Sequence, residues 1–138
     1  ESGQPLPEDT IAKLVGRYRA KALQERGNSI ARTETLAALN RSEWLATKQA
    51  LEKSGLPDDA AYKVWDSAAD SRTRPSHRKL DGVRIPINET FTSPTSGKPM
   101  MHPGDDSMGA TGQDVIGCRC RVRYEIDFFA GFRNGTET

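Results

Sequence analysis

Apolar side chains recur at helical spacing through most of the first 54 residues, and this pattern restricts the fold more than any other feature of the chain. One face of the segment after Pro7 follows the i, i+3, i+4, i+7 order of a one-sided helix. Its members are Ile11, Leu14, Val15, Tyr18 and Ala22. Gly27 is typical of a helix end and Asn28 of an N-cap, so a second helix is expected over residues 29–54. Two long helices joined by a turn would form an antiparallel hairpin.

The second expected helix has a less regular apolar face than the first. Four apolar residues share one face and two more lie on its flank. The four are Leu36, Leu39, Ala46 and Ala50, and the two are Trp44 and Leu51. Asn40 and Thr47 fall between these groups. At a rise of 1.5 Å per residue this helix would be about 39 Å long, which favours a hairpin that protrudes from the rest of the protein.

The second half of the chain changes to the two-residue period of strands. Residues 61–67 alternate, with Tyr62 and Val64 on one face and Lys63 and Trp65 on the other. This alternation predicts a β-strand.

Two further segments complete the first part of the predicted sheet region. Residues 83–87 follow an Asp-Gly turn, and Pro86 restricts them to a short edge strand. Residues 92–114 are rich in Gly, Pro, Ser, Thr and Asp, so they are expected to form a long exposed loop.

The clearest strand pattern is residues 118–126. One face would carry Cys118, Cys120, Val122, Tyr124 and Ile126, and the other Arg119, Arg121, Arg123 and Glu125. The chain is therefore expected to be an α+β protein. Residues 1–55 would form a long N-terminal antiparallel helical hairpin. Residues 56–138 would form a small, mainly antiparallel β domain with long loops and an aromatic tail.

Charge and hydropathy argue against two broad classes of protein, nucleic-acid coats and membrane proteins. The net charge of +1 argues against a dedicated nucleic-acid coat, so any basic footprint must be local. No apolar run approaches the roughly 20 residues that span a bilayer, so no membrane association is expected.

The block DSRTRPSH, residues 70–77, is polar, charged and stiffened by a proline. Asp70, Arg72, Arg74 and His77 admit an enzymatic interpretation, with His77 as general acid or base and the arginines holding a phosphate. The alternative is a turn in which the carboxylate accepts backbone N–H groups and the guanidiniums bind carbonyls. We favour the turn, because no second acid–base residue lies at a sequence spacing that would indicate a catalytic pair with His77.

The two cysteines form a C-x-C pair. A disulfide between Cys118 and Cys120 would close a strained ring. On a straight strand their side chains start roughly 7 Å apart, too far to share one ion. We therefore expect buried core cysteines and no cofactor. The alternative is a zinc site completed by His77 and His102, or by an acidic residue such as Asp70, and such a site would need the backbone to bend.

Two surface features have both a structural and a functional interpretation. Arg119, Arg121 and Arg123 form a basic stripe that either is solvated and paired with acids or follows a phosphate backbone. Three aromatic side chains near the C-terminus are expected to pack on the core, or otherwise to form a partner surface. They are Phe128, Phe129 and Phe132.

Taken in order, the motifs resemble the phage head morphogenesis domain of the Mu F-like minor head proteins, from roughly residue 20 to residue 122. The resemblance rests on an Arg-Thr-Glu in the long helix, a strand with a tryptophan, the D-x-R-x-R-x-x-H block, an Asp-Gly turn and a terminal C-R-C. The residues that carry it are Arg32, Glu34, Trp65, Asp70, Arg72, Arg74, His77, Asp81, Gly82, Cys118 and Cys120.

The resemblance implies a structural minor head protein of the virion rather than an enzyme, located at the portal vertex of the head and in the host cytoplasm during assembly. It implies the portal protein or the major capsid protein as partners, with genomic double-stranded DNA as a further candidate, and a role in head assembly or in DNA packaging and ejection. The helical hairpin would be the docking arm. The alternatives are a nuclease-like or toxin-type enzyme that uses His77 with Arg72 or Arg74, and a sequence-independent DNA-binding module.

Overall fold

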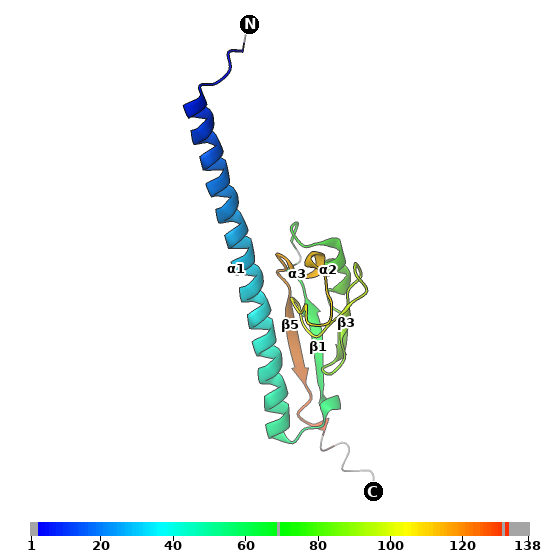
Figure 1. Ribbon diagram of the computed structural model, residues 1–138. Coiled ribbons are helices and arrows are strands. Elements are labelled where there is room, and N and C mark those ends of the chain that lie inside the picture. The colour runs from blue at the N-terminus through cyan, green and yellow to red at the C-terminus, as the bar shows by residue number, and fades with distance from the viewer. Residues whose placement is uncertain (1–2, 69, 131, 133–138) are drawn as a thin grey trace.

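The computed structural model of the 138-residue chain describes residues 3–68, 70–130 and 132. Its dominant element is a single helix, α1 (Glu8–Ser54), which spans 47 residues and is about 70 Å long (Figure 1). The acidic residues Glu8 and Asp9 in its first turn complement the helix dipole. The helix ends at Gly55, which adopts the left-handed conformation with φ 70°.

The predicted α+β class is confirmed, but the predicted helical hairpin is wrong. The helix runs without a break through Gly27 and Asn28. An exposed glycine inside a helix costs only about 1 kcal/mol relative to alanine. The sequence holds no proline between Pro7 and Pro57, so the backbone hydrogen bonds can continue through the glycine.

A three-stranded antiparallel sheet follows the helix, with strand order β2-β1-β5. Its strands are β1 (Ala61–Asp66), β2 (Arg84–Pro86) and β5 (Arg121–Ile126). The predicted strands at residues 61–67 and 83–87 are confirmed. The shorter of the two, β2, lies at an edge of the sheet, as its proline predicted.

Short elements fill the connections between these strands. They are a 3-10 turn at Asp58–Ala60, α2 (Pro75–Leu80), the hairpin strands β3 (Phe91–Thr92) and β4 (Pro99–Met100), and α3 (Gly112–Val115). The predicted loop over residues 92–114 is largely irregular, with β4 and most of α3 within it. The expectation that it is exposed is wrong in part, because Met100, His102 and Asp114 are buried.

The hydrophobic core lies between the sheet, these connections and α1. Its main cluster is Trp65, Leu80, Phe91, Met100, Cys118, Cys120 and Val122, and a smaller one is Leu51, Ala61 and Ile87. Both faces of β1 are covered, since Val64 on one face and Lys63 and Trp65 on the other are all buried.

The C-terminal half of α1 lies along β5 (Figure 1). Its covered positions are three and four residues apart: Thr33, Leu36, Ala37, Asn40, Glu43, Trp44, Thr47, Lys48 and Leu51. The apolar face predicted for residues 29–54 was wrong. Leu39, which was placed on that face, is exposed, whereas Asn40, which was placed outside it, is buried. The reason is a buried hydrogen bond of 3.2 Å from the Asn40 amide to the carbonyl oxygen of Cys120.

A close backbone approach also fixes the helix against the loop after β4. Gly104 has φ +82°, and a Cβ atom on it would lie 3.0 Å from the Cβ of Ala37. A larger residue would push this loop away from the helix.

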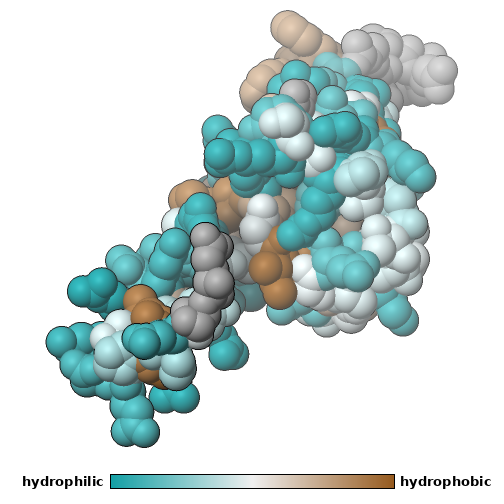
Figure 2. Space-filling model, turned by 90° about the horizontal axis from the view of Figure 1, so that it is seen from above, coloured by the Kyte–Doolittle hydropathy of each residue, from teal (hydrophilic) through white to brown (hydrophobic). Residues whose placement is uncertain are grey.

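The N-terminal half of α1 projects beyond the rest of the protein (Figure 1). Its apolar residues Ile11, Leu14, Val15 and Tyr18 are exposed, Tyr18 to 75%. A 3.6-residue period places them on the same helix face as the residues that pack on β5. Viewed from above, apolar side chains lie exposed among polar ones on the projecting part (Figure 2). None of the described helices is long and apolar enough to cross a membrane.

Candidate functional site

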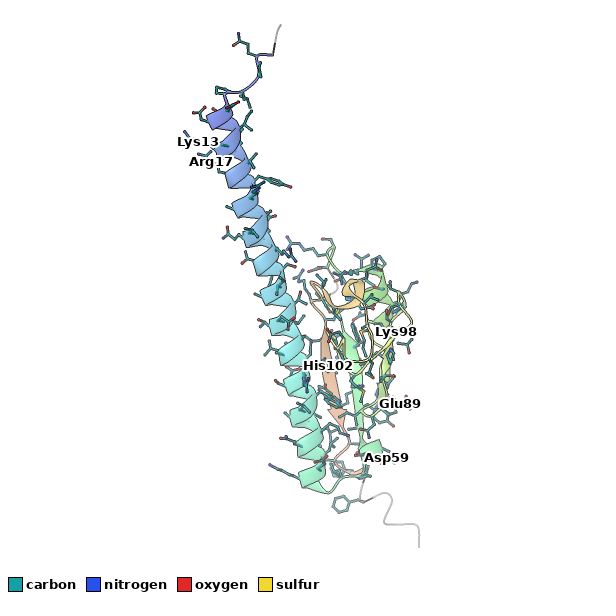
Figure 3. The ribbon with its side chains drawn as sticks, viewed as in Figure 1. Lys13, Arg17, Asp59, Glu89, Lys98 and His102 are labelled. Atoms are coloured by element: carbon teal, nitrogen blue, oxygen red, sulfur yellow. The ribbon has the colours of Figure 1, made fainter. Side chains whose placement is uncertain are left out.

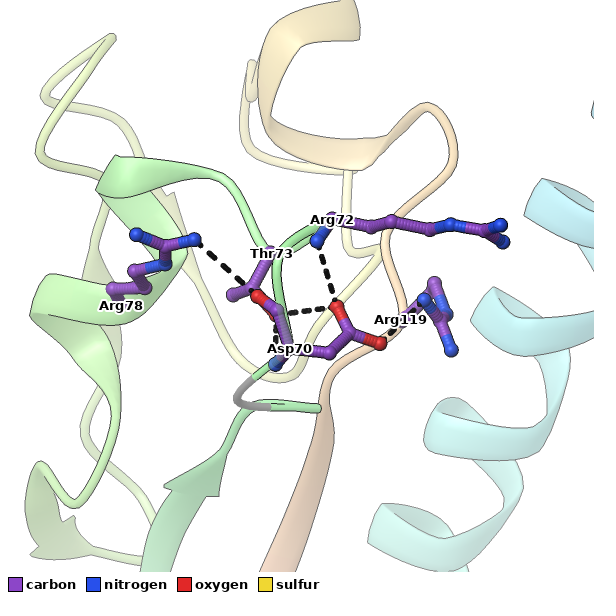
Figure 4. A network of polar contacts seen from close by, with 5 residues as sticks. All are labelled: Asp70, Arg72, Thr73, Arg78 and Arg119. Carbon is purple, nitrogen blue, oxygen red and sulfur yellow. Dashed lines mark hydrogen bonds and ion pairs between the residues drawn. The ribbon is translucent and has the colours of Figure 1, made fainter.

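The block at residues 70–77 forms a tightly tied turn around Asp70 (Figure 4). The Asp70 carboxylate accepts hydrogen bonds from the Arg72 backbone N–H at 2.9 Å and the Thr73 hydroxyl at 3.3 Å, and it pairs with Arg119 at 2.7 Å. Arg78 donates to the Asp70 carbonyl at 3.3 Å. Desolvation opposes ionisation, but the Arg72 N–H and the Arg119 charge outweigh it and lower the pKa of Asp70.

Arg74 connects this turn to the segment before β5. It stands at the N-terminal end of α2, next to a proline in the first helical position. Its guanidinium donates to the carbonyl of Gln113 at 2.6 Å and to the carbonyl of Ile116. The planar fork therefore holds α2 and α3 together.

The Asp-Gly turn lies directly before β2 and is held to the end of β1. The Asp81 carboxylate accepts the backbone N–H of Ser67 at 2.9 Å, and the Gly82 N–H donates to the carbonyl of Trp65 at 2.8 Å. The Trp65 ring packs edge-on against Phe91, with ring centroids 5.1 Å apart.

His77 lies at the centre of the site, 3% exposed, between α3 and the cysteine pair. Its Nε2 lies 3.0 Å from the carbonyl oxygen of Asp114, and its Nδ1 lies 3.5 Å from the sulfur of Cys120. A carbonyl oxygen can only accept, so we assign the ring proton to Nε2. The unprotonated Nδ1 then faces the sulfur.

Both cysteine side chains reach this histidine. The two sulfurs and a His77 ring nitrogen all lie within 4.8 Å of one another, and all three residues are buried. The predicted straight strand over residues 118–126 is wrong at its start, because β5 begins only at Arg121. Gly117 adopts a left-handed φ of +65°, and the Cys118 N–H donates to the Val115 carbonyl. The backbone therefore bends directly before the predicted strand, and residues 118–120 lie outside β5.

The thiols of this pair differ in acidity. A hydrogen bond that the Cys118 thiol donates to the Cys120 sulfur outweighs burial and lowers the pKa of Cys120. The same contact between the two sulfurs, together with burial, raises the pKa of Cys118.

Asp114 organises the segment that holds His77, and our sequence analysis did not single it out. Its buried carboxylate accepts the Thr111 N–H at 2.9 Å, the Thr111 hydroxyl at 3.0 Å and the Ser96 hydroxyl at 2.7 Å. The Ser93 hydroxyl also donates to it. The spacing T-x-x-D at residues 111–114 is a capping-box signal that indicates this role from sequence alone.

Lys63 is a second buried polar residue that the sequence analysis did not connect to any partner. Its ammonium donates to the carbonyl oxygen of Met101 at 2.7 Å and lies 5.2 Å from the centre of the Phe91 ring. Burial lowers the pKa of Lys63 to about 8, although the negative charge of Asp105 opposes this shift.

His102 does not join the cysteine pair, although one alternative of the sequence analysis placed it there. It is buried beside α1, where its ring centroid lies 6.5 Å from that of Trp44 (Figure 3). Its Nδ1 lies 2.9 Å from the carbonyl oxygen of Pro103.

The Arg-Thr-Glu motif of α1 contacts the site through its middle residue. Arg32 and Glu34 are exposed. The hydroxyl of Thr33 accepts the backbone N–H of Gly117 at 3.0 Å. This contact joins the helix to the bend that brings the cysteines together.

The basic stripe of β5 lies among acidic side chains. Arg119 pairs with Asp70 at 2.7 Å, and Arg121 with Glu43 at 3.1 Å. Arg123 lies 3.9 Å from Glu125. Each of the three arginines thus has an acidic neighbour, in agreement with the interpretation of the stripe as paired with acids.

The aromatic residues near the C-terminus are exposed. Phe128, Phe129 and Phe132 expose 66%, 69% and 76% of their surface. The expectation that they pack on the core is wrong, because β5 ends at Ile126 and the chain leaves the sheet there. Three exposed aromatic rings close together are typical of an interaction surface.

Comparison with known proteins identifies the family of the chain. Residues 8–123 match the family described as Phage Mu protein F like protein. Minor head protein GP7 of Bacillus phage SPP1 is 36% identical over 97 residues, which make up 70% of this chain and 29% of that protein. The chain thus spans less than a third of the length of this relative. No solved structure matches. The resemblance inferred from the motifs is confirmed, and the chain belongs to the family of Phage Mu protein F-like proteins.

Proposed function

We propose that the chain is a structural part of a phage head, positioned at the portal vertex, where it acts in head assembly or in DNA packaging and ejection. The observation that carries this proposal is its family membership, with a relative named as a minor head protein. We place the protein in the virion head and, during assembly, in the host cytoplasm.

The geometry of the polar block supports a structural role over catalysis. A general acid or base must reach the substrate, whereas His77 is buried and both ring nitrogens face groups of the protein. The guanidinium of Arg74 binds two backbone carbonyls rather than lying open for a phosphate. His77 and Arg74, two residues of the alternative nuclease site, are thus engaged in contacts within the fold.

The projecting half of α1 is the proposed docking arm, and the portal protein is its proposed partner. The face of α1 that packs on β5 in its C-terminal half continues as an exposed apolar stripe of Ile11, Leu14, Val15 and Tyr18 in the N-terminal half. Lys13 and Arg17 lie on the opposite face of the helix (Figure 3). A helix with one apolar and one charged face is suited to pack against another apolar surface.

Binding to the portal protein of the same phage tests the arm. Leu14→Glu should weaken co-purification of the full chain with that protein, because it places a charge in the apolar stripe. Lys13→Ala is the matched control, since it changes the net charge by the same amount on the opposite face. Equal binding by both variants would contradict the proposed docking arm, provided that circular dichroism shows unchanged helix content. Absence of the chain from purified particles would contradict the head role itself.

Incubation with DNA and RNA tests the enzymatic alternative. We expect no cleavage with or without divalent metal ions. Cleavage that disappears in a folded His77→Ala variant would overturn the structural role. DNA affinity that falls steeply with salt and is weakened by Arg119→Ala and Arg121→Ala would instead indicate a binding module.

A further inference from the structure

Three metal-ligand side chains converge inside the fold from segments far apart in the sequence. His77 comes from α2, and the two cysteines come from the bend before β5, 43 residues away for the His77–Cys120 pair. Their donor atoms lie within 4.8 Å of one another. Thiolate sulfur and imidazole nitrogen together are the donors that zinc prefers in proteins.

We propose that His77, Cys118 and Cys120 bind one zinc ion. A zinc–sulfur bond of about 2.3 Å and a zinc–nitrogen bond of about 2.0 Å at the tetrahedral angle place sulfur and nitrogen about 3.5 Å apart. The separation between the Cys120 sulfur and Nδ1 of His77 is 3.5 Å. The protein thus already holds this pair of donors at the spacing that a shared tetrahedral ion requires.

The orientation of the histidine is also that of a metal ligand. A ligating imidazole usually donates its other ring N–H to a carbonyl or carboxylate, which fixes the ring and leaves a lone pair for the metal. Here Nε2 faces the carbonyl oxygen of Asp114, so Nδ1 is the free donor that faces the sulfurs. The carboxylate of Asp114 in turn holds α3 through Thr111, which keeps this carbonyl in place.

The fourth coordination position is assigned to a water molecule. Within the described residues, no fourth His, Cys, Asp or Glu joins the group. A cavity of about 10 Å³ adjoins Cys120 and His77 and is also lined by Thr73, Arg74 and Gly117. This is about the volume that one water needs. The ion would replace packing between two small thiols with bonds that tie the start of β5 to α2.

Metal content of the chain, purified under reducing conditions, is the direct test. We expect about one zinc per chain. Chelation should lower the melting temperature, and added zinc should restore it, because metal binding is linked to folding. Cobalt(II) added to the metal-free chain should give the thiolate-to-cobalt absorption of a tetrahedral site.

Single substitutions identify the ligands. Cys118→Ser, Cys120→Ser and His77→Gln should each abolish stoichiometric zinc, whereas the control His102→Gln should retain it. If the cysteine variants do not fold, a thiol reagent added to the unmodified chain decides the matter: modification of two thiols should release one zinc. A reduced native chain with neither stoichiometric zinc nor cobalt absorption would overturn the site, and so would zinc retained by both cysteine variants.

Discussion

The backbone N–H of Gly117 donates a 3.0 Å hydrogen bond to the hydroxyl of Thr33, 84 residues earlier in the chain. Gly117 is also the left-handed residue at which the backbone bends before β5. The contact therefore connects the long helix to the bend that brings the two cysteines toward His77. It gives the Arg-Thr-Glu motif a structural role, because the residue between its two charged members makes the connection.

Thr33→Val should lower the free energy of unfolding by about 1 kcal/mol, since it leaves the Gly117 N–H without its acceptor. Thr33→Ser keeps the hydroxyl and should restore most of this stability. Urea denaturation measures both effects. Thr35→Val, at an exposed position of the same helix, is the control, and an equal loss there would indicate that helix propensity rather than the hydrogen bond is responsible.

The strands could be predicted from the sequence because the alternation of residue types along a strand reflects which of its side chains are buried. Residues 61–67 and 83–87 form strands close to the predicted bounds, and Pro86 lies on an edge strand. Local sequence signals could not show in the same way whether the helical segment folds into a hairpin. Gly27 and Asn28 are local signals, and a turn there would form only if the two helix segments packed on each other. The apolar face of the first segment instead continues that of the second.

The candidate site was only partly predictable. His77, Arg74 and Asp70 were found because they are clustered in the sequence. The bend at Gly117 was not, since an alternating pattern from Cys118 to Ile126 fits a straight strand equally well. Asn40 and Lys63 are buried by partners distant in the sequence, Cys120 and Met101, which no local pattern reveals.

Arg74→Lys should destabilise the protein by about 1–2 kcal/mol, although it preserves the charge. The guanidinium reaches the carbonyls of Gln113 and Ile116 together, and a single ammonium cannot reproduce this fork. Arg72→Lys is the matched control, because Arg72 is exposed in the same turn. Chemical denaturation of the two variants should separate them, and equal midpoints would show that the fork contributes nothing to stability.

Asp114→Asn should cost about 2–3 kcal/mol of unfolding free energy, because four donors converge on its carboxylate. Burial opposes ionisation of this group, but the hydrogen bonds from Ser93, Ser96 and Thr111 prevail and lower the pKa of Asp114. A lowered carboxyl pKa adds stability above the unfolded value of about 3.9, and this stability is lost as the pH falls through the folded value. Denaturation between pH 7 and pH 3 should therefore show a shallower acid decline in the variant. Asp106→Asn, at an exposed position, should keep the decline of the parent protein.

Lys63→Met should change the pH dependence of stability in the alkaline range. Burial lowers the pKa of Lys63 to about 8 in the folded protein, against 10.5 for an unperturbed lysine. Between these values the unfolded chain binds more protons than the folded one, so the stability of the parent protein rises with pH. The gain from Lys63 between pH 7 and pH 9.5 is about 2 kcal/mol for this shift.

The methionine variant cannot make this gain, because its side chain does not titrate. We therefore expect the free energy of unfolding of the variant, relative to that of the parent protein, to be highest near pH 7, where the buried ammonium of the parent is charged. This difference in stability should fall by pH 9.5. Urea denaturation of both proteins at the two pH values gives the difference directly and cancels titrations that they share. Parallel pH profiles would mean that Lys63 keeps its ordinary pKa, and that its contact with the Met101 carbonyl fully offsets its burial.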